Sequence, residues 1–132
     1  TPKPSSAASD VYKRQVGFTF DYQNENQDFI RLVMVENIHH GEHLKKSRAI
    51  HDVNATVIDK IKGRYQRGVA AGVFRKGIDP IDIHMSISAL CFFNVSNRAT
   101  FSLIFERDMD SAKALAKRRA IVVDTILQYV RA

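Results

Sequence analysis

Apolar residues recur at three- and four-residue spacing along most of this chain, which is the period of one face of a helix. The pattern predicts four helical segments, at about 26–46, 49–71, 80–105 and 111–131. Few stretches show the strict alternation of polar and apolar residues that is typical of strands. The fold is therefore predicted to be an all-α helical bundle.

The 80–105 segment carries apolar residues around most of its circumference. Asp79 and Pro80 mark its start, since aspartate accepts unpaired N–H groups at a helix cap and proline lacks the N–H that would be unpaired there. Such a helix must be covered on more than one side. With the broad apolar stripe of 111–131, it is expected to form a four-helix interface between two identical chains. The alternative is a monomeric bundle in which 80–105 is fully buried.

Nine residues of these two segments are assigned to the expected dimer interface. They are Met85, Ala89, Phe92, Phe93, Ser96, Thr100, Val122, Ile126 and Val130.

The N-terminal stretch 5–15 reads SSAASDVYKRQ and lacks a helical or alternating period. It also lacks the apolar core of a signal peptide. One legal codon string for it matches the adaptor of transposase-based sequencing libraries. Residues 1–15 are therefore expected to be a non-native, disordered tail, and 16–132 to be the natural part, a single domain that has lost its true N-terminus. The alternative is a genuine disordered tail.

Composition limits the class of protein. The net charge is +6, of which Lys3, Lys13 and Arg14 against Asp10 contribute +2, so 16–132 carries +4. This mildly basic charge is scattered and is only weak support for nucleic-acid binding. Cys91 is the only cysteine, which excludes an internal disulfide and fits a reducing compartment. Without a long apolar run to cross a membrane, we expect a soluble cytoplasmic protein.

The stretch ENIHHGEH is the one candidate for metal chemistry. Glu36 and His39 have the spacing of carboxylate-bundle metal sites, but those sites need a second such motif and two further carboxylates. His39 and His40 also point about 100° apart on a helix. No metal, no cofactor and no catalytic residue is therefore predicted, since the chain also lacks a phosphate-binding loop and a nucleophile motif.

Polar residues interrupt two apolar helix faces and suggest a ligand pocket. Ligand sites are typically apolar with a few converging polar groups, and a buried amide without a partner costs about 1–3 kcal/mol. Hydrogen bonds between helices are the alternative role for these polar groups, and the two asparagines could also lie at the dimer interface. The residues assigned to the pocket are Phe29, Leu32, Val33, Glu36, Asn37, His40, Phe93, Asn94 and Asn97.

Three segments resemble the C-terminal domain of TetR-family transcription regulators: FIRLVMVENIHHGEHLK, RGVAAGVFRKGIDPIDIHMSISALCFFNVSNRATFSLIF and AKRRAIVVDTILQYV. The resemblance implies an all-helical homodimer that binds a small effector, with the last two helices of each chain at the interface. It also implies an N-terminal helix-turn-helix domain that binds operator DNA, which this chain lacks before Val16.

The sequence therefore predicts the ligand-sensing and dimerisation domain of a TetR-like regulator, most simply a repressor. A helical metal-binding or enzymatic bundle and a ligand-free dimerisation module are the alternatives.

Overall fold

The computed structural model describes residues 4–132, with the side chains of 4–6 and 51–54 left aside. Its helices are α1 (Pro4–Glu25), α2 (Gln27–Ile38), α3 (Arg48–Ala70), α4 (Pro80–Ser96), α5 (Arg98–Ile104) and α6 (Ala112–Val130), with a short 3₁₀ turn at Leu44–Lys46. No strand is present among these residues, and only an isolated bridge joins Phe74 to Arg131. The predicted all-α fold is confirmed.

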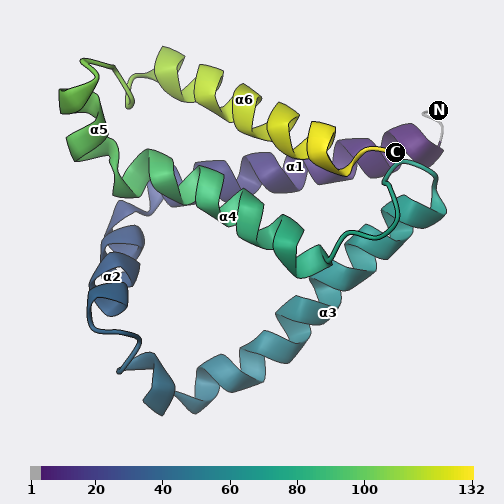
Figure 1. The fold of residues 1–132 in the computed structure, drawn as a ribbon, viewed down its shortest axis with the longest axis horizontal. Helices are drawn as coiled ribbons and strands as arrows, with labels where there is room; N and C mark the ends of the chain where they lie inside the picture. Colours follow the sequence, from purple (N-terminus) through teal and green to yellow (C-terminus); the bar gives the residue numbers. More distant parts are fainter. Residues whose placement is uncertain (1–3) are drawn as a thin grey trace.

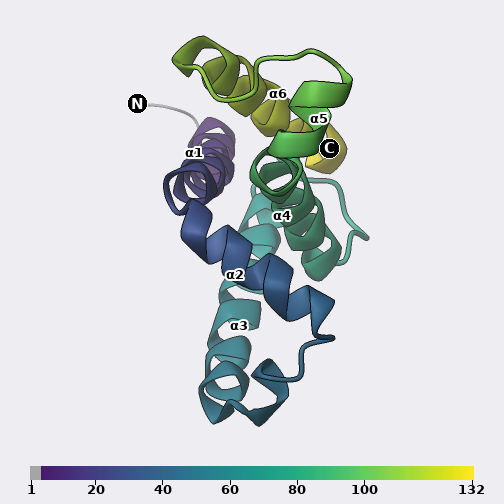
Figure 2. The same cartoon turned by 90° about the vertical axis from the view of Figure 1, so that its left-hand side faces the viewer.

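Three helices form the packed body of the domain. α1 lies against both α4 and α6, which also contact one another. α2 and α3 both contact α4, at opposite ends of it, and approach each other at the ends that the loop between them joins, so that the three helices have a triangular outline (Figure 1). Viewed from the side, α6 and α5 lie above α1 and α4, and α2 and α3 lie below them (Figure 2).

The core lies where α1, α4 and α6 meet. Each of the three helices contributes residues at three- or four-residue spacing, which is the spacing of one helix face. Burial of one such aliphatic or aromatic side chain stabilises the fold by about 1.5–3 kcal/mol. The core residues of the three helices are Val16, Phe20, Ile83, Ile87, Cys91, Val122, Ile126 and Val130, all at most 8% exposed.

Capping explains where α4 and α6 begin. The side chain of Asp79 accepts the N–H of Ile81 at 2.9 Å, ahead of Pro80 at the first helical position. At the start of α6, the hydroxyl of Ser111 accepts the N–H of Ala114 at 3.1 Å. Both caps satisfy donors that the helix itself leaves unpaired. The predicted starts of these two helices are thus correct to within a residue.

The predicted 26–46 helix ends earlier, at Ile38. His40 has φ 58° and Gly41 has φ 73°, and the N–H of Gly41 donates to the carbonyl oxygen of Glu36 at 3.0 Å. This left-handed stop closes the helix before the polar run that follows it.

The predicted 80–105 helix is interrupted at Asn97. The side chain of Arg98 donates to the carbonyl oxygen of Asn94 at 3.1 Å, the acceptor that a continuous helix would pair with the N–H of residue 98. Asparagine favours such breaks because it competes for local backbone hydrogen bonds. α4 and α5 are therefore two helices.

The expectation of a disordered tail is wrong for the part of it that the structure describes, because 4–15 belong to α1. Tyr12 is buried and packs its ring on Phe74, with centroids 4.8 Å apart. Tyr12, Val16 and Phe20 form one stripe that crosses the boundary drawn at Val16, so neither part shows it alone. Residues 1–3 lie outside the described residues, and the adaptor origin of the segment stays a prediction.

A small clamp joins the end of α6 to the connector between α3 and α4. The N–H of Arg75 donates to the carbonyl oxygen of Val130 at 2.8 Å, and the N–H of Ala132 donates to that of Val73 at 2.9 Å. The Tyr65 hydroxyl donates to the carbonyl oxygen of Arg75 at 2.6 Å and accepts the N–H of Ile78 at 3.1 Å. The clamp fixes α3 relative to the C-terminus.

Candidate ligand-binding site

The predicted pocket residues of α2 do not enclose a cavity together. Phe29 is 50% exposed and Leu32 66% exposed. Asn37 donates its side-chain N–H to the carbonyl oxygen of Val33 within the same helix, at 3.0 Å, and His40 is exposed in the left-handed stop. The structure therefore separates these residues from Phe93 and Asn94, which line a different cavity near α5.

Glu36 shapes the loop after α2. Its carboxylate accepts the N–H groups of His43 and Leu44 at 2.8 and 2.9 Å, and its second oxygen lies 2.9 Å from Nδ1 of His43. The bond from the Leu44 N–H is the largest cause that holds the pKa of Glu36 below its ordinary value. The polar residue that interrupts this face thus closes a loop instead of facing a ligand.

Asn94 takes the structural role that was the alternative to ligand binding. It is 4% exposed, and its side-chain N–H donates to Oδ1 of Asn24 on α1 at 3.2 Å. The guanidinium of Arg98 donates to the same oxygen at 2.6 Å. Asn97 is partly buried and forms the break between α4 and α5. The hydrogen bond between Asn94 and Asn24 therefore fixes α1 against the end of α4.

A cavity of about 240 Å³ lies between α1, α3 and α4. This volume suits a small ligand with about one ring. Apolar side chains make up part of its wall, and polar side chains from all three helices reach it. The lining residues are Tyr12, Gln15, Thr19, Val57, Lys60, Ile61, Arg64, His84 and Ile87. We call it the α1–α3–α4 cavity.

Of the polar side chains that line the α1–α3–α4 cavity, Thr19 donates to the carbonyl oxygen of Gln15 at 3.0 Å. Within the described part of the chain, the others, namely the Tyr12 hydroxyl and the side chains of Gln15, Lys60, Arg64 and His84, have no hydrogen-bond partner in the protein. Burial raises the pKa of Tyr12 to about 12, which the positive charge of Arg64 partly opposes. The hydroxyl therefore stays protonated, and the cavity offers mainly donors, with no carboxylate in its lining.

This cavity cannot be read from the sequence, for an identifiable reason. Lys60 and Arg64 are four residues apart and share one face of α3, but such charged residues are read as a solvated helix surface. Only the packing of α3 on α1 and α4 brings them beside His84. The one available signal was their position next to the apolar Val57 and Ile61 on the same helix.

The nine residues predicted for a dimer interface divide into two groups. Val122, Ile126 and Val130 are at most 1% exposed within the chain itself, so they belong to its own core. A broad apolar stripe does not tell which neighbour covers it, and the dimer interface stays a prediction. The six on the outer side of α4 and α5 are exposed or partly exposed: Met85, Ala89, Phe92, Phe93, Ser96 and Thr100.

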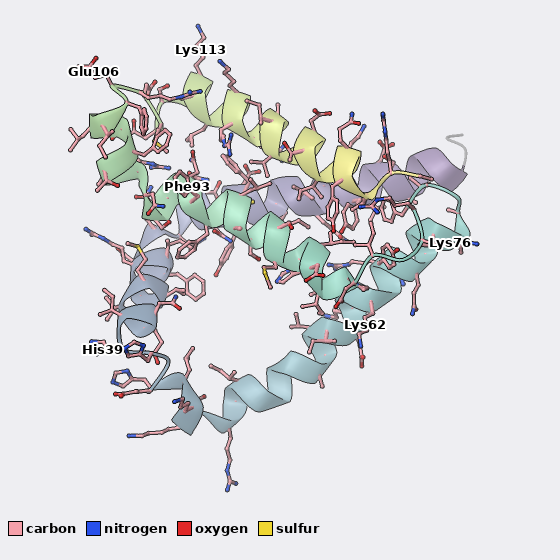
Figure 3. The ribbon with its side chains drawn as sticks, viewed as in Figure 1. His39, Lys62, Lys76, Phe93, Glu106 and Lys113 are labelled. Carbon is pink, nitrogen blue, oxygen red and sulfur yellow. The ribbon has the colours of Figure 1, made fainter. Side chains whose placement is uncertain are left out.

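A metal site and a membrane-spanning helix are both absent from the described part of the chain. Within 4–132, apart from the side chains set aside above, no group of three or more histidine, cysteine or acidic residues is placed to hold a metal ion. His39 lies at the end of α2, beside the loop (Figure 3). No helix in that part of the chain has the length and apolar character needed to span a membrane.

Comparison with known proteins agrees with this arrangement of helices. The family described as "Tetracyclin repressor-like, C-terminal domain" matches residues 10–126, which is most of the chain. The chain belongs to the TetR family. The HTH-type transcriptional repressor NicS of Pseudomonas putida is 28% identical over 116 residues, which are 88% of this chain and 55% of NicS. This TetR-family chain thus spans little more than half the length of that relative.

The resemblance seen in the sequence is therefore confirmed. The TetR-family match points to a transcription regulator, not to an enzyme.

Proposed function

We propose that this chain is the effector-sensing and dimerisation domain of a cytoplasmic TetR-family repressor. Its relative NicS is described as a transcriptional repressor of the HTH type, and the chain spans 55% of its length. On this proposal, a helix-turn-helix domain precedes Val16 in the natural protein and binds operator DNA. Sequencing the source locus upstream of the Val16 codon tests this point, since a reading frame without a helix-turn-helix would contradict it.

The observation that carries the sensing role is the polar lining of the α1–α3–α4 cavity. The side chains of Lys60, Arg64 and His84, from α3 and α4, line it without partners among the described residues, and they lie outside the adaptor-like stretch that contains Tyr12 and Gln15. Such groups hydrogen-bond to water when they have no other partner, and a ligand that carries acceptors on an apolar body would replace that water. Such a ligand bridges α3 to α1 and α4, so it favours the arrangement of the helices that it binds best.

The dimerisation role rests on the outer faces of α4 and α6. Met85 on α4 is 63% exposed. Between these two helices lies a hollow of about 410 Å³ with an almost wholly apolar lining that includes Ala89, Leu90 and Tyr129. A second copy of the same surface would cover both features.

A cavity-filling variant tests the sensing role. We would screen a library of small molecules for those that raise the melting temperature of the protein, and repeat the screen with Ile61→Trp, which fills the α1–α3–α4 cavity. A ligand that binds only the folded form raises the melting temperature, and the rise grows with the ratio of ligand concentration to Kd. The proposal expects hits whose effect is lost in I61W and kept in the control Ile38→Trp on α2. A library without hits, or hits that I61W leaves intact, would contradict it.

A further inference from the structure

A second cavity lies at the other end of the bundle, where α5 turns back into α6. Its volume is about 620 Å³. Its lining contains no residue before Phe93, so it depends neither on the adaptor-like segment nor on the α1–α3–α4 cavity. Phe93, Glu106 and Lys113 mark the α4, loop and α6 sides of this end of the molecule (Figure 3). We call it the α5–α6 cavity.

One wall of the α5–α6 cavity is aromatic. The rings of Phe93 and Phe101 meet edge to face with centroids 5.5 Å apart, and those of Phe101 and Phe105 are 4.5 Å apart. Phe93 is nevertheless 40% exposed and Phe105 62% exposed. A row of three rings that remains this exposed offers an alkyl chain or an aromatic ring an apolar surface to pack on.

The opposite wall is cationic. Arg107 from the loop and Lys113, Lys117 and Arg118 from the first half of α6 line it. Within the described residues, none of these four forms an ion pair, since the ion pairs there are Lys13–Asp10, His43–Glu36 and Arg119–Asp21. The positive end of the α6 dipole adds to their charge.

The two carboxylates in the lining do not cancel this charge. Asp108 is engaged at the cap of α6, where it accepts the Ser111 hydroxyl and the N–H groups of Asp110 and Ser111. The Ser111 hydroxyl is the main cause that holds the pKa of Asp108 below its ordinary value. Glu106 is the other acid, so four cations face two anions.

We propose that the α5–α6 cavity binds amphipathic organic anions, that is, a carboxylate on an apolar chain or ring. The apolar part packs along Phe93, Phe101 and Phe105, and the carboxylate faces Lys117 and Arg107. The α5–α6 cavity is a separate site from the α1–α3–α4 cavity, so a ligand can occupy either one without the other.

Three probes that share one alkyl chain test the proposal: decanoate, decanol and decyltrimethylammonium, titrated into the full chain by calorimetry. Decanoate is expected to bind about tenfold or more tightly than decanol, because charge-assisted hydrogen bonds are the stronger ones. The cation is expected not to bind. Equal binding of decanoate and decanol, or no binding of decanoate, would overturn the proposal.

Charge-reversal variants locate the site. Lys117→Glu and Arg107→Glu are exposed changes that should each weaken decanoate binding about tenfold. Lys62→Glu makes the same charge change on α3, far along the chain from this cavity, and should leave the affinity unchanged. If K62E weakens binding as much as K117E does, the effect is one of net charge, and the proposal fails.

A fluorescent reporter separates the two cavities. The sequence contains no tryptophan, so Phe105→Trp and, separately, Val57→Trp each place a single fluorophore at the rim of one cavity. Decanoate is expected to shift the emission of F105W and not that of V57W. A shift in V57W alone would place decanoate in the α1–α3–α4 cavity. That result would overturn the proposal of a second site and leave the proposed function intact.

Discussion

The ring of Phe74 lies where a side chain of Gly68 would otherwise stand. A Cβ at Gly68 would overlap Cδ2 of Phe74, which is 3% exposed and cannot move outward. The N–H of Phe74 also donates to the carbonyl oxygen of Gly68 at 3.1 Å, so the connector folds back onto α3 at a position where the helix has no side chain.

Gly68→Ala is therefore expected to destabilise the domain by about 1–3 kcal/mol, as overpacking of a core does. Gly63→Ala is the matched control in the same helix, because the nearest atom to its Cβ is the flexible Nη1 of Arg67 at 3.3 Å. This second change should stabilise the domain by about 0.5–1 kcal/mol through helix propensity. Urea unfolding measures both, and equal effects would contradict the role of Phe74.

Asn24→Ala tests the link between α1 and the end of α4. It leaves the buried amide of Asn94 without its partner, at an expected cost of about 1–3 kcal/mol in the free energy of unfolding. Adding Asn94→Leu removes the unpaired amide as well and should recover part of that loss. If the double variant loses as much stability as the two single changes together, or more, the hydrogen bond is not the source of the effect.

The loop after α2 is expected to open in acid. The pKa of Glu36 is lowered in the folded state, chiefly by the N–H of Leu44, so the folded form binds fewer protons than the unfolded form. The stabilisation is present above the unfolded pKa of about 4.3 and is lost as the pH falls through the lowered folded value. Amide exchange at His43 and Leu44 measures this. Glu36→Gln should already expose both amides at pH 7, whereas Glu42→Gln should not.

Met85→Glu is expected to convert a dimer into a monomer without unfolding the chain. Met85 is 63% exposed within one chain, so a charge there harms only an assembly that buries it. Light scattering measures the mass, and circular dichroism the fold. Ile38→Glu, at a site that is 71% exposed on α2, is the control and should remain dimeric. A dimer that survives M85E would move the interface elsewhere.

Cys91 is expected to be chemically inert in the folded protein. It is fully buried among α1, α4 and α6, and burial raises the pKa of its thiol to about 12. Since the thiolate is the reactive form, Ellman's reagent at pH 8 should modify it only as fast as the domain unfolds. In urea the reaction should be complete at once. Rapid modification of the native protein would show that this part of the core opens.

The sequence is most informative where a pattern lies within one helix. Asp79 and Pro80 announce the start of α4, and the spacing of apolar residues finds α3 and α6 nearly to their ends. The break at Asn97 is harder to foresee, because it depends on the side chain of Arg98 taking a backbone acceptor. The apolar stripe of Tyr12, Val16 and Phe20 is hard to recognise in the sequence, because it crosses the boundary at Val16 that the adaptor-like codon string suggests.

Which neighbour covers an apolar face is a property of the assembled bundle. Val122 and Ile126 have the spacing of an interface but lie inside the chain, and the buried amide of Asn94 meets Asn24, seventy residues away in sequence. The α1–α3–α4 cavity likewise arises from three helices that are distant along the chain. Periodicity gives the face of one helix, and only packing assigns its partner.

The clamp between Arg75 and Val130 has a topological consequence. Its backbone hydrogen bonds join the two ends of the segment that runs from the α3–α4 connector to the C-terminus. α4, α5 and α6 thus form a helical hairpin whose two ends are hydrogen-bonded to each other, and the α5–α6 turn lies at the opposite end (Figure 1). Local unfolding of the hairpin should begin at that turn, whereas a tag fused after Ala132 would lie at the end that the hydrogen bonds hold in place.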